Sequence, residues 1–182
     1  MENSNKHIPE QELIERCISG ERKCQEILYR RYADKMYNVS LTYTNDEDEA
    51  CDILQEGFIK VFRNLQTFQF QGSLEGWIRK IVVNTALEFY RKKKREQENL
   101  DNYEIFADTN IDSVLDKINS EDIIKLVNQL PSKAAMVLKL FAIEGYNHKE
   151  IAIIMEISEG TSKSQLNRAR FLFKEAISKY NG

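Results

Sequence analysis

The scarcity of glycine and proline is the feature that most constrains how this chain can fold. Only two prolines and seven glycines occur in 182 residues. Turn-rich β structure depends on these two residue types, whereas helix interiors exclude them. Apolar residues accordingly recur at helical spacing, as in Leu28, Tyr32 and Met36, and Gly20 separates the first two predicted helices. The sequence therefore predicts an all-α protein.

Composition and motif content narrow the class of protein further. No apolar run approaches the ~20 residues that span a bilayer, and the N-terminal stretch MENSNKHIPEQELIERC lacks the basic and apolar regions of a signal peptide. We therefore expect a cytoplasmic protein without membrane insertion. An enzyme is the least favoured class, because the sequence contains no glycine-rich phosphate loop and no catalytic triad.

The cysteines and histidines do not form a ligand pattern. Cys17, Cys24 and Cys51 have no CxxC spacing, and His7 and His148 lie far apart in the sequence. A structural zinc site normally uses four ligands at short paired spacings. We predict no metal, no cofactor and three buried free thiols.

Charge is segregated along the chain although the net charge is only −3. Residues 45–56 hold six acidic residues and no basic one, whereas 76–95 hold seven basic residues and the single acid Glu88. Residues 96–122 then hold nine acidic residues and one lysine. Asymmetry on this scale favours separate binding surfaces within one acidic chain.

The helical periodicity stops between residues 96 and 120, where the sequence is acidic and rich in asparagine. Helical patterns fill residues 10–95 before this segment and 121–178 after it. We expect two small helical domains joined by a flexible acidic linker at 96–120, the second domain containing a helix-turn-helix.

In the first domain, the helix predicted over residues 49–64 has an apolar face and an opposite polar face. The polar face consists of Asp52, Gln55, Glu56, Ile59 and Arg63. Its isoleucine is either a scattered surface residue, which is common, or part of a contact patch for a basic partner. The loop QTFQFQGS (66–73) then leads into a basic helix at 75–95, whose outward face has Lys80, Asn84 and Arg91 with Trp77 at its edge.

Residues 148–170 of the second domain have the pattern of a helix-turn-helix. Asn147 and Ser158 are placed to cap the two helices, and Ser162, Leu166 and Ala169 face inward from the second. Its outward residues are of types that contact phosphates and base edges: Gly160, Thr161, Lys163, Ser164, Asn167 and Arg168. Plain helical domains also contain such shapes, so this pattern alone leaves DNA binding open.

Taken together, the two halves resemble the sigma-70 family of RNA polymerase sigma factors, of the extracytoplasmic-function (ECF) type. The helices DILQEGFIKVFRN and GWIRKIVVNTALEFYRK resemble sigma region 2, and LP…EGYNHKEIA…ISEGTSKS…RAR resembles region 4. The resemblance covers roughly residues 10–178. It implies an alternative sigma factor that binds core RNA polymerase and directs promoter recognition, DNA melting and transcription initiation.

The resemblance also implies a role for each surface. Helix 49–64 would bind the clamp helices of the largest polymerase subunit through its polar face. Helix 159–170 would lie in the major groove of the −35 element, and an anti-sigma factor is an implied partner. The loop and the basic helix would contact the −10 element, by stacking on a flipped base and by hydrogen bonding, through Phe68, Phe70, Gln71, Ser73, Trp77, Lys80, Asn84 and Arg91.

Three residues depart from the family pattern in the second domain. Glu156 stands where the turn usually has glycine, Ser162 where a core residue is usually apolar, and Gln165 where an arginine is usual.

Two alternative functions remain open beside the sigma-factor interpretation. A helix-turn-helix regulator would bind an operator without core polymerase, and a helical adaptor would have no role on DNA.

Overall fold

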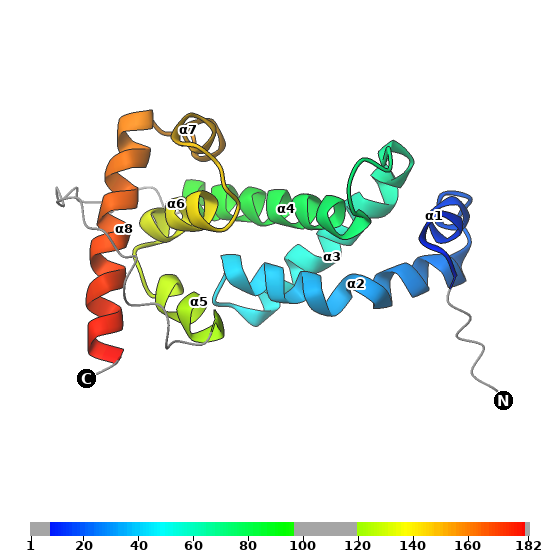
Figure 1. Cartoon of the computed structure of the whole chain (residues 1–182), viewed down its shortest axis with the longest axis horizontal. Coiled ribbons are helices and arrows are strands. Elements are labelled where there is room, and N and C mark those ends of the chain that lie inside the picture. The colour runs from blue at the N-terminus through cyan, green and yellow to red at the C-terminus, as the bar shows by residue number, and fades with distance from the viewer. Residues whose placement is uncertain (1–7, 97–119, 181–182) are drawn as a thin grey trace. The chain divides into compact units, whose positions relative to one another are not determined.

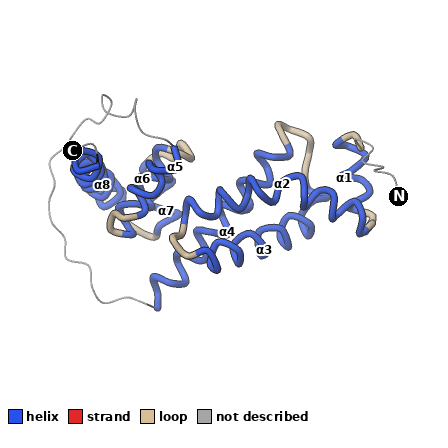
Figure 2. Tube along the Cα trace, turned by 90° about the horizontal axis from the view of Figure 1, so that it is seen from below, coloured by secondary structure: helices blue, strands red, loops and turns tan. Residues whose placement is uncertain are grey.

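The computed structural model describes residues 8–96 and 120–180, and every regular element in these ranges is a helix (Figures 1 and 2). The contacts divide the chain into two compact units, residues 1–90 and 91–182. The predicted all-α fold class is confirmed. The predicted linker lies outside the described residues except at its two ends. No helix in the described ranges is long and apolar enough to span a membrane.

The first unit is built from helices that lie side by side, with one short helix across their end. The elements are α1 (Glu10–Ile18), α2 (Arg22–Tyr43), α3 (Glu47–Asn64), the 3-10 turn η1 (Leu65–Thr67) and α4 (Leu74–Glu96), which continues past the boundary at residue 90. α2 and α3 pack along each other, and α1 packs against both α2 and η1 (Figure 1). Gly20, at φ +86°, makes the turn between α1 and α2, a conformation that costs glycine little.

Close packing of α3 against α4 fixes the basic helix. A Cβ atom added at Gly57 would lie 3.1 Å from Val82 Cγ2, so the absent side chain sets how closely the two helices approach. An ion pair of 2.6 Å between Lys60 and Glu88 also joins them. Glu88, the one acid within residues 76–95, is exposed and is paired with Lys60 of α3.

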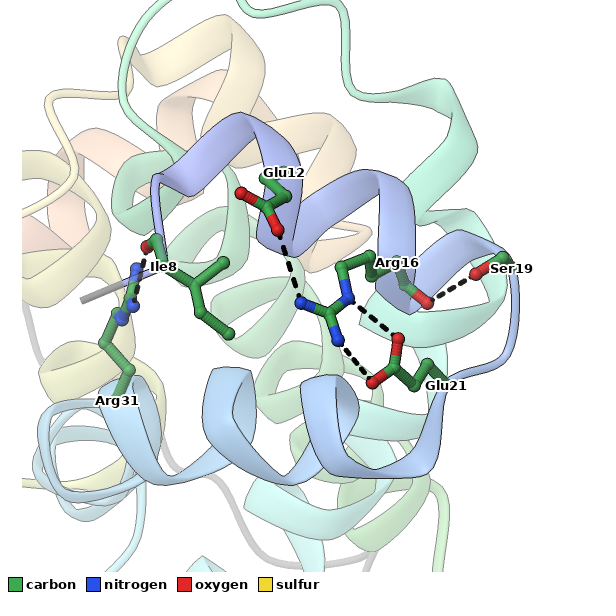
Figure 3. A network of polar contacts seen from close by, with 6 residues as sticks. All are labelled: Ile8, Glu12, Arg16, Ser19, Glu21 and Arg31. Carbon is green, nitrogen blue, oxygen red and sulfur yellow. Dashed lines mark hydrogen bonds and ion pairs between the residues drawn. The ribbon is translucent and has the colours of Figure 1, made fainter. Parts of the chain in front are cut away.

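A polar network closes the turn between α1 and α2 (Figure 3). The guanidinium of Arg16 donates to both carboxylate oxygens of Glu21, over 2.8 and 2.6 Å, and to Glu12 over 3.3 Å. The hydroxyl of Ser19 donates to the Arg16 carbonyl oxygen at 2.9 Å. The hydrogen bond from Arg16 lowers the pKa of Glu21. This network fixes the position of α1, which packs against η1.

The cysteines are only partly as predicted. Cys17 and Cys24 are buried free thiols, and burial raises the pKa of Cys17 to about 11. Cys51 is exposed on α3, so the prediction that it is buried was wrong. Its position on the solvent side of the amphipathic helix explains the difference, because it lies beside Asp52 and not on the Ala50 face.

The second unit packs three shorter helices against one long one. Its elements are α5 (Ser120–Asn128), α6 (Ser132–Ala142), α7 (His148–Met155) and α8 (Glu159–Tyr180). The apolar core between α5, α6 and α8 includes Leu126, Ala134, Ala169 and Phe173. α7 packs on α6 and α8. The short α7 and the first turns of α8 thus share one scaffold.

Candidate nucleic-acid interface

A side-chain cap and acidic residues mark the start of α3. The Asp46 side chain accepts from the backbone N–H groups of Asp48 and Glu49, at 2.9 and 3.1 Å, and caps the helix. Acidic residues in this first turn also suit the positive end of the helix dipole. The helix therefore begins with a fixed cluster of negative charge.

All five predicted core-binding residues of α3 lie on its outward side. Ile59 is 43% exposed, and Glu56 is half-buried. The other three, Asp52, Gln55 and Arg63, are exposed. An exposed isoleucine with carboxylates around it suits a partner that is basic at its rim and apolar at its centre.

Three aromatic rings lie together at the loop after η1, two from the loop itself and one from Trp77 of α4. Phe68 is only 7% exposed, and its ring centroid lies 5.1 Å from that of Phe70 and 5.6 Å from that of Trp77. Phe70 is 52% exposed. The same stacking role was predicted from the sequence for both phenylalanines. The structure separates them, because Phe68 is a core residue and only Phe70 offers an accessible ring face.

The backbone at Phe70 is left-handed, with φ 57°. For a residue with a Cβ this conformation costs about 1–2 kcal/mol, and it occurs mostly in turns and functional loops. Gly72 follows with φ +92°, which glycine adopts freely. Two left-handed residues within three positions turn the loop outward and hold the Phe70 ring over Phe68.

Ser73 ends this loop as the cap of α4. Its hydroxyl oxygen accepts from the Gly76 backbone N–H at 3.1 Å, which leaves its own O–H to donate elsewhere. Glu75 in the same turn pairs with Lys35 of α2 at 2.7 Å. Along α4, residues 77, 80, 84 and 91 follow Ser73 at helical spacing and share one side. On that side Lys80 and Asn84 are exposed, and Trp77 and Arg91 are half-buried.

The helix-turn-helix of the second unit is built on paired caps. Asn147 forms a capping box with Glu150 at the start of α7. The Ser158 hydroxyl accepts from the Thr161 N–H at 2.9 Å at the start of α8. Glu156 takes the left-handed conformation at φ 55° that the family pattern assigns to glycine. A tight turn therefore forms here with the strain of a non-glycine residue.

Several of the polar residues at the start of α8 already have local partners. Lys163 pairs with Glu159 at 2.8 Å, and the Ser164 hydroxyl donates to the Thr161 carbonyl oxygen at 3.0 Å. Gly160, Lys163 and Ser164 are exposed, and Asn167 is half-buried.

Arg168 lies differently from its neighbours on α8. It is half-buried and lines a groove of about 760 Å³ together with Leu130 and Pro131 from the α5–α6 turn and with Phe171 and Glu175 from α8. Arg168 thus packs along the second unit's own core, whereas Lys163 and Ser164 point to solvent.

The contact between His148 and Ser162 was not predicted from the sequence. His148 Nδ1 lies 2.9 Å from the Ser162 hydroxyl oxygen, and Ser162 is fully buried. The polar residue at an expected core position is therefore hydrogen bonded to the one histidine of the helix-turn-helix. The two residues are 14 positions apart and lie on different helices, so helical periodicity does not link them. Only the folded structure shows the hydrogen bond.

Two family descriptions match the chain: Sigma-70 region 2 over residues 28–96 and Sigma-70, region 4 over residues 120–170. The ECF RNA polymerase sigma-E factor of Haemophilus influenzae is 28% identical, over 93% of this chain and 96% of that protein. The RNA polymerase sigma-H factor of Pseudomonas aeruginosa is 29% identical, over 92% of this chain and 93% of that protein.

The solved structures that are similar in fold include the sigma factor RpoE in complex with the anti-sigma factor NepR from Bartonella quintana, with a TM-score of 0.50 and 21% sequence identity. The similarity covers 84% of this chain and 96% of that one. The helical architecture is therefore shared even where the sequences have diverged.

Proposed function

Because this chain belongs to the sigma-70 family and is an alternative sigma factor of the ECF type, we propose that it guides core RNA polymerase to promoters through three of its own surfaces. These are the outward face of α3, the Phe70 loop with the outer side of α4, and the start of α8. Sigma factors are not enzymes, and we assign no catalytic residue. The observation that carries the proposal is the exposed Phe70 ring beside a cationic helix face.

The α3 face binds the clamp helices of the largest polymerase subunit. Ile59 fills an apolar contact at the centre, and the carboxylates of Asp52 and Glu56 pair with basic residues of the clamp. Gln55 and Arg63 extend this contact along the helix. The exposure of Ile59 among acidic residues supports this assignment.

The Phe70 ring stacks on a base flipped out of the −10 element, and Phe68, which itself contacts Trp77, supports the Phe70 ring. The Ser73 oxygen accepts from Gly76, and its O–H remains to donate to an acceptor on the edge of this base. Gln71 supplies a second hydrogen bond, and the α4 residues Lys80, Asn84 and Arg91 follow the phosphates.

The start of α8 enters the major groove of the −35 element, with Gly160 and Thr161 closest to the DNA and Lys163, Ser164 and Asn167 along the groove. Lys163 exchanges its pairing with Glu159 for a phosphate. Arg168 acts mainly by packing and only its guanidinium end reaches DNA, as its place in the α5–α6 groove suggests.

We further propose that the chain works in the cytoplasm and is held inactive by an anti-sigma factor, as the Bartonella relative is bound by NepR. The test of the whole proposal is promoter-directed transcription with purified core polymerase. We expect defined start sites only when the chain is added. A chain that binds an operator tightly while ignoring core polymerase would instead support the alternative of an independent helix-turn-helix regulator.

A further inference from the structure

A buried hydroxyl in the second unit has an unusual partner. Ser162 is 0% exposed on the inner side of α8, and a buried hydroxyl without a hydrogen bond destabilises a fold. His148, the first residue of α7, supplies the partner through Nδ1 at 2.9 Å. This hydrogen bond joins the two helices of the helix-turn-helix directly.

The imidazole of His148 is also held by stacking. Its ring lies nearly parallel to Phe141 of α6, with centroids 5.1 Å apart and an interplanar angle of 23°. The guanidinium of Arg170 lies 5.7 Å from the same Phe141 ring. With Nδ1 directed at Ser162 and one face on Phe141, the half-buried ring has its Nε2 edge left for a ligand from outside.

The charges around this ring favour an anion. From α8, Lys163 and Arg170 face it as cations and Glu159 as the one acid, and Glu159 is already paired with Lys163 at 2.8 Å. From α7 itself, Lys149 is exposed beside it. Phe141, the residue of α6 that contacts the ring, is uncharged. Burial, followed by Lys163 and Arg170, lowers the pKa of His148, and Glu159 opposes them.

We propose that His148 binds a backbone phosphate of the −35 duplex through Nε2, with Ser162 fixing the ring on the opposite side. This rests on the proposed role of α8 at the −35 element and adds a contact outside α8. Phosphate oxygens only accept hydrogen bonds, so the contact requires a proton on Nε2. In the neutral ring Nδ1 is then an acceptor, and the Ser162 hydroxyl donates to it.

The contact makes DNA binding depend on pH. A phosphate beside Nε2 raises the pKa of His148 in the complex above that of the free chain, so binding takes up a proton from solvent. In the imidazolium both nitrogens donate, and the Ser162 oxygen accepts instead. Affinity for the −35 element therefore rises as pH falls from 7.5 to 6.0.

The experiment uses holoenzyme assembled from the full chain and core polymerase. The probes are a promoter duplex selected with this holoenzyme from random DNA and the same duplex with a scrambled −35 segment. We expect the wild-type preference for the selected duplex to increase at least about threefold between pH 7.5 and 6.0. His148→Gln should abolish this increase and, at pH 6.0, where the bound ring is charged, reduce the salt slope by about one.

Two further variants keep the test decisive. Ser162→Ala should retain the pH dependence with weaker binding at pH 7.5, and Lys174→Gln, an exposed cation further along α8, should behave as wild type. If His148→Gln kept the wild-type pH profile and salt slope, the phosphate contact would be overturned alone. If wild-type holoenzyme did not distinguish the two duplexes, the −35 role of α8 would fall with it.

Discussion

The two regions that we propose to contact DNA differ in how they are built. The loop at 68–73 presents one exposed aromatic ring, held by left-handed backbone at Phe70 and Gly72 and supported by buried Phe68. The start of α8 is regular helix, fixed by the Ser158 cap, and its polar side chains largely pair with one another. A strained loop suits a single base removed from the stack, whereas a rigid helix suits the groove of an intact duplex.

Replacing Phe70 with alanine should produce the largest functional effect. Base stacking on an aromatic ring contributes about 1–3 kcal/mol, so we expect initiation to fall roughly ten- to a hundredfold, with core binding kept. Promoter opening with purified holoenzyme measures the loss, and a thermal melt should be unchanged.

The matched variant is Phe68→Ala, which should lower the stability of the first unit by about 3–5 kcal/mol because the ring is buried. If Phe68→Ala abolished initiation without changing the melting temperature, Phe68 and not Phe70 would be the stacking residue.

The corresponding change in the other region is Asn167→Ala with Arg168→Ala. We expect −35-dependent initiation to drop about tenfold while core binding persists, since a good base contact discriminates by about 1–3 kcal/mol. Arg168→Ala alone should also lower the melting temperature, because its stem packs in the groove beside Leu130. Full activity of the double variant would count against α8 as the reading helix.

A smaller effect is expected on the stability of the two units when a glycine is replaced with alanine. Gly57→Ala should destabilise the first unit by about 1–3 kcal/mol, because the new methyl group would lie 3.1 Å from Val82 Cγ2. Gly160→Ala is the control, since a Cβ there meets only the Ser158 hydroxyl at 3.7 Å. Urea unfolding of both variants measures the difference, and equal stability would mean that α3 and α4 can move apart at no cost.

The smallest effect concerns ion pairs. Arg16 lowers the pKa of Glu21, and Lys163 lowers that of Glu159. A carboxylate with a lowered pKa stabilises the fold above its unfolded pKa of about 4.3 and loses this as pH falls through the folded value. Glu21→Gln should therefore lower the urea midpoint slightly at pH 7 and not below pH 3.

Glu159→Gln should change the midpoint less, because its pair lies within one helix while the Glu21 pair joins α1 to the start of α2. High salt should reduce both effects. Equal shifts for the two variants would show that the α1 network of Figure 3 does not fasten α1.

Local rules explain what could be predicted from the sequence. Helix periodicity, the caps at Asp46, Asn147 and Ser158, and the turn at Glu156 depend on neighbours within about four residues. The outward faces of α3 and of the first turns of α8 follow from the same spacing. These features were therefore accessible before any tertiary structure was known.

The sequence alone thus determined an all-α chain with segregated charge and a helix-turn-helix. Tertiary packing decided which of two similar phenylalanines is exposed, that Arg168 packs into a groove, that Cys51 faces solvent, and that His148 meets Ser162. The reason is physical. Side-chain burial and cross-helix hydrogen bonds depend on how separate helices dock, and residues distant in sequence make those contacts without leaving a period in the sequence.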